Sequence, residues 1–352
     1  MIRSIVLRCA LLAATTACPA KVSWSHILRQ PTAWYATDEA RTIADNVLLF
    51  QTESGGWPKN VDETTPPTAE FIAATAADHR WPTIDNDATT TEIRFLAQVT
   101  TATPKPAYTQ AALRGIDYLL VAQSPSGGWP QFFPLRDGYY QHITFNDDAT
   151  VNVLNVLRAI AQNAPTYQFV DDDRRPRAAA AVERGIACIL KTQVVQSGKL
   201  TGWCAQHDQA TLAPAWARNF EPPSLSGNES VGVVRFLMGI EKPSPAVVAS
   251  IDSAVTWLQS ASVSGLRIDN TPGADGKKDR HAIADPAAPK LWARFYELET
   301  HRPIFIGRDR VIRYDFNEIE RERRTGYAYL GTWPADLLSK DYPRWKAKQP
   351  KS

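Results

Sequence analysis

Two acid-rich segments carry side chains that could bind a cation. Asp85–Asp87 (Asp-Asn-Asp) and Asn146–Asp148 (Asn-Asp-Asp) each place three carboxylate or amide groups in a row, followed by Ala-Thr and a helix-like stretch. A helix start needs only one capping residue, with a first-turn acid worth about 0.3–1 kcal/mol. Capping in a solvated loop explains either segment alone, but the same surplus of like charges found twice favours a bound cation. Oxygen ligands of this kind suit Ca²⁺ or Mg²⁺.

Two arginines in loop-like segments offer the complementary chemistry. Arg218 lies in WARNFEPP and Arg308 lies in FIGRDR. Arginine binds a planar carboxylate through two parallel hydrogen bonds. An anionic ligand could therefore be held between these arginines and a cation with open coordination positions. Surface ion pairs with Glu221 and Asp309 are the alternative.

The elements that must position these residues repeat along the chain. Gln51–Pro58 (QTESGGWP) recurs as Gln123–Pro130 (QSPSGGWP), 123 − 51 = 72 residues later, and Arg184–Gln193 leads into a third copy at Gly202-Trp203. This period exceeds the roughly 20–50 residues of common solenoids and fits two helices with a long connection. The repeated turn predicts that its tryptophans are core residues, although tryptophans and neighbouring tyrosines (Tyr139, Tyr140) could also stack on sugars.

Each repeat unit consists of a helix, a turn and polar loop, an acid-rich helix start and a second helix. The stretches after the acid-rich segments, TTTEIRFLAQV and VNVLNVLRAI, have apolar residues at helical spacing, and Ser224–Val231 is a possible third copy. We therefore predict a mainly α fold in which helical hairpins form an α/α toroid, with the polar loops at one face. The long connection Leu266–Pro289 is a candidate functional loop.

Composition limits the class of protein. The 352 residues include 39 Lys+Arg, 37 Asp+Glu and 44% apolar residues, which is typical of a globular chain. Residues 1–20 combine two arginines, no acid, a short apolar stretch and a small-residue end, which predicts a signal peptide cleaved after Ala20 and a single domain at 21–352. Lipidation at Cys18 is the alternative. We expect the mature protein to be periplasmic or extracellular.

The predicted mature chain has no charge excess. Removing Arg3 and Arg8 takes the formal charge from +2 to 0, which argues against a surface for nucleic acid or anionic lipid. No later apolar stretch reaches the roughly 18 residues of a membrane span. Cys188 and Cys204 could form a disulfide in an oxidising compartment or stay buried as thiols. The absence of CxxC and HExxH motifs leaves a zinc site without support.

The motifs together resemble the pectate lyases of polysaccharide lyase family 10. The resemblance runs from about Asp38 to Trp345 and is carried by QTESGGWPKN, TIDNDATTTEIRFLAQV, GGWPQFFP, HITFNDDATVNVL, CAQHD, ARNFEPPSLSGNES, GRD and EIERERRTGYAYLGTWP. It implies an (α/α)3 toroid with a central groove and a secreted, Ca²⁺-dependent enzyme, which we expect to be monomeric. The implied reaction is cleavage of the α-1,4 bonds of polygalacturonate by β-elimination.

The resemblance also implies residue roles. Asp85, Asn86 and Asp147 correspond to the calcium ligands, with Asp85 also in the region that binds the substrate carboxylate. Arg218 matches the base that abstracts the C5 proton, and Arg308 resembles a second substrate-binding arginine.

Two further positions follow from the same comparison. Lys59, after the first GGWP, is expected to reach the substrate. Arg310 departs from the family pattern, in which glycine is more usual, and this puts the local turn in doubt.

The proposed chemistry explains why these groups are needed. The C5 proton is α to an ionised carboxylate and is therefore very weakly acidic, so positive charge must neutralise that carboxylate. A guanidinium is ordinarily protonated, and neighbouring positive charge favours its neutral form. We therefore expect a rate that rises towards high pH; an acidic optimum would favour Asp208 or Glu221 as the base.

Three rival functions fit parts of the sequence. The QxxxGxW turns also occur in terpenoid cyclases, but polar loops and export argue against a carbocation cavity. An inverting glycoside hydrolase could use two of the acids Asp87, Asp148, Asp208 and Glu229. A pectin-binding module without activity is the third.

Overall fold

The computed structural model describes residues 22–78 and 82–349, so the predicted signal peptide and Cys18 lie outside the described residues. Its helices are α1 Asp38–Phe50, α2 Ala69–Asp78, α3 Thr90–Ala102, α4 Pro106–Val121, α5 Ala149–Ala161, α6 Arg174–Thr192, α7 Glu229–Met238, α8 Pro245–Ser260, α9 Arg321–Gly326 and α10 Tyr342–Lys346. Short 3₁₀ helices include η1 Trp24–Arg29, η3 Asp85–Asp87 and η5 Asn146–Asp148. No described helix is long and apolar enough to cross a bilayer.

The strands are short and pair in twos within the described residues. The antiparallel pairs are β1 Ile143–Thr144 with β4 Gln206–His207, β2 Val195–Gln196 with β3 Lys199–Leu200, β5 Leu225–Ser226 with β9 Phe295–Tyr296, β6 Leu266–Asp269 with β7 His281–Ala284, β8 Trp292–Ala293 with β12 Leu330–Gly331, and β10 Phe305–Ile306 with β11 Ile312–Arg313. The prediction of a mainly α fold is confirmed.

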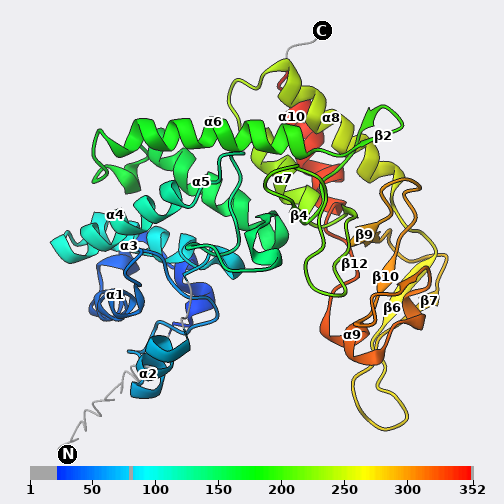
Figure 1. The fold of residues 1–352 in the computed structure, drawn as a ribbon, viewed down its shortest axis with the longest axis horizontal. Coiled ribbons are helices and arrows are strands. Elements are labelled where there is room, and N and C mark those ends of the chain that lie inside the picture. The colour runs from blue at the N-terminus through cyan, green and yellow to red at the C-terminus, as the bar shows by residue number, and fades with distance from the viewer. Residues whose placement is uncertain (1–21, 79–81, 350–352) are drawn as a thin grey trace, which may run out of the picture.

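Successive helices form antiparallel hairpins that pack side by side. The hairpins α3/α4, α5/α6 and α7/α8 follow one another along the molecule (Figure 1). In one layer α3 contacts α5 and α5 contacts α7, while in the other α4 contacts α6 and α6 contacts α8. The segments η3 and η5, which precede α3 and α5, contact each other. Hairpin stacking thus brings the two acid-rich segments together.

The repeated tryptophans join each turn to the end of the preceding helix. The indole N–H of Trp57 donates to Val47 O at 2.9 Å, that of Trp129 to Leu119 O at 2.7 Å, and that of Trp203 to Ile189 O at 2.8 Å. All three indoles are fully buried. The prediction that Trp57 and Trp129 are core residues is confirmed, and Trp203 has the same role.

The repeated glutamines and glycines have matching structural roles. Gln51 Nε2 donates to Gly55 O and to Ala111 O on α4, at 2.7 and 2.8 Å, which ties the turn to the next helix; Gln123 and Gln193 repeat this arrangement. Gly55 has φ +96°, and a Cβ there would lie 2.4 Å from Arg114 O. The repeat therefore records packing between hairpins rather than chemistry.

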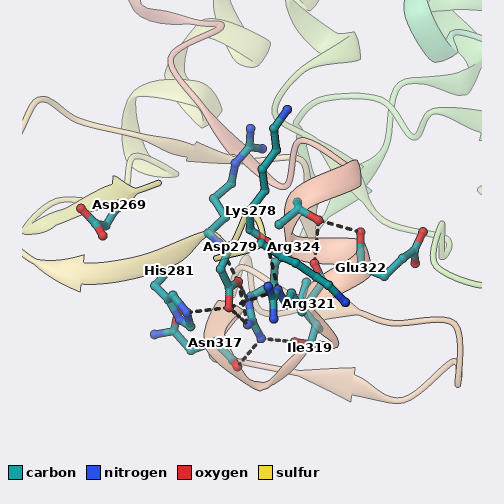
Figure 2. Close-up of polar contacts among 12 residues, drawn as sticks. Asp269, Lys278, Asp279, His281, Asn317, Ile319, Arg321, Glu322 and Arg324 are labelled. Carbon is teal, nitrogen blue, oxygen red and sulfur yellow. Dashed lines mark hydrogen bonds and ion pairs between the residues drawn. The ribbon is translucent and has the colours of Figure 1, made fainter. Parts of the chain in front are cut away.

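A second apolar cluster includes residues of the C-terminal strands β9 and β10. The long connection Leu266–Pro289 is held by ion pairs to α9. Leu266–Pro289 forms the β6–β7 hairpin, and its Asp279 receives hydrogen bonds from Arg324 of α9 at 2.8 and 3.0 Å (Figure 2). Burial raises the pKa of Asp279, but Arg324 and the Arg280 backbone outweigh it and lower it to about 2. Arg321 also bonds Asp275. The connection therefore holds α9 in place.

Both described cysteines are free thiols. Cys188 and Cys204 are buried, and burial raises the pKa of Cys188 to about 11 and also raises that of Cys204. Of the two alternatives, burial without a disulfide is therefore the one observed.

Candidate active site

The two acid-rich segments adopt the same unusual backbone. Asn86 and Asp87 have φ of 51° and 62°, and Asp147 and Asp148 have φ of 50° and 58°. Asn and Asp tolerate this left-handed region better than most residues, yet successive residues in it are uncommon. The structure therefore uses equivalent turns in two repeats to present acidic side chains at one place.

Three repeat units contribute carboxylates to this place. Asp85 forms an ion pair with Lys59. Arg294 donates to Asp147 at 3.1 Å and to Glu229, the first residue of α7, at 2.5 Å. Arg294 has only 7% of its side chain exposed and Glu229 is fully buried. Arg294 therefore joins the second and third repeat units.

Negative charge exceeds the paired positive charge here. Burial raises the pKa of Asp147, and repulsion by Glu229 and Asp85 adds to the effect, although Arg294 opposes it. Burial also raises the pKa of Asp148 to about 6, with contributions from Glu229 and Asp87. Carboxylates that repel one another gain from a nearby cation. This is the electrostatic situation expected of a cation-binding cluster.

The chemistry of the predicted metal ligands suits a hard cation. Asp85 and Asp147 supply carboxylate oxygens, and Asn86 donates its amide N–H to Asn60 Oδ1 at 2.9 Å, which leaves its own Oδ1 as an acceptor. No group of three or more His, Cys, Asp or Glu side chains able to hold a metal occurs in the described ranges. Two carboxylates and one amide are nevertheless oxygen donors of the kind that Ca²⁺ prefers.

Arg218 is held by Glu221, the ion-pair partner that the sequence offered as the alternative to a ligand. Its Nε and Nη2 donate to the carboxylate of Glu221 at 2.7 and 2.5 Å, and Tyr327 donates its hydroxyl to the same carboxylate at 2.8 Å. Burial lowers the pKa of Arg218, but Glu221 outweighs it and the pKa lies above its ordinary value. In this state Arg218 is a firmly protonated cation.

Arg308 has a different partner from the one considered. Its Nε and Nη2 donate to Glu322 at 3.0 and 3.1 Å, whereas Asp309 pairs with Arg313. The Arg308 side chain is 61% exposed. It therefore remains accessible to a ligand.

Aromatic rings connect these groups. The Phe220 ring lies 4.9, 5.7 and 4.5 Å from the guanidinium carbons of Arg218, Arg308 and Arg323. These three cations around one ring form a cluster suited to carboxylate ligands. We call it the arginine cluster.

Tyr327 lies between the arginine cluster and the acids. Its ring centroid is 5.5 Å from the guanidinium carbon of Arg218 and 4.8 Å from that of Arg294, which in turn bonds Asp147. The structure thus brings Lys59, Asp85 and Asp147 into one group and Arg218 and Arg308 into another. Tyr327 and Arg294 connect the two groups.

Sequence reasoning missed three residues of this connection. Arg323 and Tyr327 stand within EIERERRTGYAYLGTWP, but their spacing indicates no role, and Arg294 belongs to no repeat or motif. Their positions depend on contacts between segments distant in sequence. No local signal could have identified them.

Basic and aromatic side chains also flank the site. Lys59 Nζ lies 5.6 Å from the Phe132 ring centroid, and the Arg136 guanidinium lies 4.4 Å from that of Tyr140. Tyr139 packs against Tyr140, with ring centroids 4.1 Å apart. Sugar stacking on these tyrosines stays a prediction.

The departure at Arg310 has a local cost. Its φ is +64°, a conformation that glycine adopts freely. Its guanidinium lies 4.4 Å from the ring centroid of Trp216. The turn is formed with arginine in place, and Arg308 keeps its contacts.

Comparisons with known proteins identify the family. The sequence model of the pectic acid lyase family matches residues 51–338. A mutant of a family 10 polysaccharide lyase from Cellvibrio cellulosa, in complex with trigalacturonic acid, is similar at 33% identity with a TM-score of 0.78, over 93% of this chain and 96% of that one. The family 10 lyase from the same organism gives 33% identity and a TM-score of 0.76, over 91% and 94%. Comparison with curated proteins gives no match.

These matches decide among the enzyme classes considered above. Both solved structures are lyases, and the likeness spans almost the whole of each chain. A terpenoid cyclase or a glycoside hydrolase is therefore excluded as the class. The chain belongs to the pectic acid lyase family and is a polysaccharide lyase.

Proposed function

We propose that this protein is a pectate lyase that cleaves polygalacturonate by Ca²⁺-assisted β-elimination, with Arg218 as the base. The observation that carries the proposal is the link from the acids of three repeat units, through Arg294 and Tyr327, to the arginine cluster. A polyanionic substrate needs positive charge concentrated where it binds. The arginine cluster would supply part of this charge, and a cation bound by the acids would supply the rest. The trigalacturonic acid bound by the similar lyase supports this substrate class.

Asp85, Asn86 and Asp147 would hold the calcium ion. When bound, Ca²⁺ supplies Lewis-acid stabilisation of the charge that develops on the substrate carboxylate. Lys59, paired with Asp85, and Arg308, exposed at the arginine cluster, would bind carboxylates of the sugar units. Together they fix the uronate ring and compensate its charge.

Arg218 would take the C5 proton. Removal of this proton and departure of the oxygen on C4 leave a C4–C5 double bond, and the leaving oxygen takes a proton from solvent. A guanidinium that receives a proton must first be neutral, so the pair with Glu221 has to loosen in the productive state. The positive charges of Arg308 and Arg323 favour this, and so does alkaline medium.

The remaining proposals concern the whole molecule. We propose that the helical hairpins form the (α/α)3 toroid of the family, that residues 1–20 direct secretion to the periplasm or cell exterior, and that the enzyme is a monomer. The hairpins α3/α4, α5/α6 and α7/α8 support the first of these.

One assay tests the function. Polygalacturonate is incubated with the protein in Ca²⁺ or in EDTA, and both ultraviolet absorbance of the unsaturated product and new reducing ends are followed. Absorbance that requires Ca²⁺ is expected. Reducing ends without absorbance would indicate hydrolysis, and neither signal would indicate a binding module; both results contradict the proposal.

A further inference from the structure

A polar pocket of about 550 Å³ lies beside the proposed calcium ligands. Its walls come from η1, the loop 58–61, the first acid-rich segment and α3. Ligand sites commonly have volumes of about 300–1,000 Å³. We propose that this pocket is an additional subsite that binds a galacturonate unit of the substrate distant from the bond that is cleaved. The proposal rests on the proposed function.

Two arginines in the pocket lack partners. Arg29, at the end of η1, and Arg94, on α3, both line it and are exposed, and neither side chain has a hydrogen bond or ion pair within the described part of the chain. The charge of Arg94 acts at longer range on Asp87, Tyr35 and Tyr167. Other cations near the site, such as Lys59 and Arg218, have acidic partners. Arg29 and Arg94 are therefore available to bind a carboxylate.

The net charge of the side chains in and beside the pocket is positive. Lys59 and Asp85 neutralise each other, and Asp87 is the remaining exposed acid in the lining. Glu92 is buried, and burial raises its pKa to about 8, so near neutral pH it carries a proton. Arg29 and Arg94 then exceed the single charge of Asp87, and a uronate carboxylate would restore the balance.

The other lining groups suit a sugar. Asn152 donates to Asp87 at 2.6 Å and Asn60 accepts from Asn86, so each amide keeps one polar group for a hydroxyl. Trp24 is partly exposed and offers an apolar surface to a pyranose ring. Carboxylate, hydroxyl and ring face thus all have a counterpart in the pocket.

Position makes the pocket an extension of the active site. Lys59 and Asn86 line it and also belong to the proposed catalytic group. A polymer bound there could continue past them. The η1 wall precedes residue 51, where the family match begins, so this chain builds the subsite partly with residues outside the matched range.

Chain-length dependence tests the subsite. Dissociation constants of trigalacturonate and hexagalacturonate are measured by calorimetry, with Ca²⁺, in an Arg218→Ala background with and without Arg29→Ala/Arg94→Ala. We expect the hexamer to bind about 10-fold more weakly without the two arginines and the trimer to change less than about 2-fold. Arg177→Ala on α6, outside the pocket, is the matched control and should change neither.

Two results would overturn the proposal. If the two substitutions weakened the binding of the trimer and the hexamer equally, the arginines would belong to the central subsites. If hexamer binding were unchanged, the pocket would not be a subsite. Melting temperatures show whether the variants fold, and Arg29→Gln/Arg94→Gln repeats the test with polar side chains. The turnover assay tests the proposed function separately. If the wild type gave no unsaturated product but the double arginine variant still lost hexamer binding, the proposed function would be refuted and the subsite would stand.

Discussion

Arg218 and Glu221 form a two-point ion pair in which Nε and Nη2 of the arginine meet the carboxylate at 2.7 and 2.5 Å. Glu221 is only 3% exposed, while 44% of the Arg218 side chain remains accessible. The pair orients the guanidinium and at the same time strengthens its hold on its proton. The contact that positions the Arg218 guanidinium therefore also makes it a poorer base.

Replacing Glu221 should separate these two effects. Glu221→Gln removes the charge that raises the pKa of Arg218, so the alkaline limb of the kcat/KM profile should move to lower pH by about one unit. Tyr327→Phe removes a hydrogen bond to Glu221 but leaves its charge, and its profile should stay in place. An unmoved profile in Glu221→Gln would show that this carboxylate does not control the titrating group.

Arg294 should be essential for stability. Arg294→Met leaves the buried Glu229 carboxylate without its cation, which should lower the free energy of unfolding by about 3–5 kcal/mol in urea titrations. Arg308→Ala, which breaks an exposed pair, should cost less than about 1 kcal/mol and raise KM. Equal stability losses in the two variants would be inconsistent with the buried bridge.

Calcium binding should be visible without substrate. A ligand that binds only the folded protein raises Tm, so millimolar Ca²⁺ should raise the Tm of the wild type. Asp85→Asn/Asp147→Asn should abolish most of the rise, whereas Asp208→Asn, in a separate loop, should keep it. A rise preserved in the double variant would place the ion elsewhere.

Glu92 should make stability depend on pH. Burial raises its pKa from 4.5 to about 8. Between these values only the folded state binds this proton, so its contribution to stability falls as pH rises, by up to about 1.4 kcal/mol per unit, and levels off above pH 8. Urea titrations at several pH values should show a smaller decline in Glu92→Gln, but not in the exposed Glu53→Gln. Parallel declines in all three proteins would contradict this.

Local patterns predicted the parts of the fold that repeat. The Gln/Gly/Trp turn recurs because each hairpin uses the same contacts, such as Gln51 with Ala111 and Trp57 with Val47. The acid-rich segments were also predictable, since their excess over capping needs is a local property. The structure confirms that they adopt the same turn and lie together.

Contacts between residues distant in the chain could not be predicted from the sequence. The hydrogen bond between Arg294 and Asp147 spans 147 positions, and neither residue has a pattern that refers to the other. Leu266–Pro289 was predicted to be a candidate functional loop, but the sequence did not predict that its Asp275 and Asp279 pair with Arg321 and Arg324 of α9. The partner of Arg308 was likewise set by the fold, which brings Glu322 and not Asp309 to it.

Arg218 carries the central claim, and one measurement tests it most directly. Formation of unsaturated product from polygalacturonate is followed at saturating Ca²⁺ and alkaline pH for wild type, Arg218→Lys and Arg218→Ala, with Tm confirming that each is folded. Loss of a general base usually costs about 10²–10⁴-fold in rate. We predict a fall in kcat of at least about 10²-fold in Arg218→Ala; a rate near that of the wild type would contradict the account.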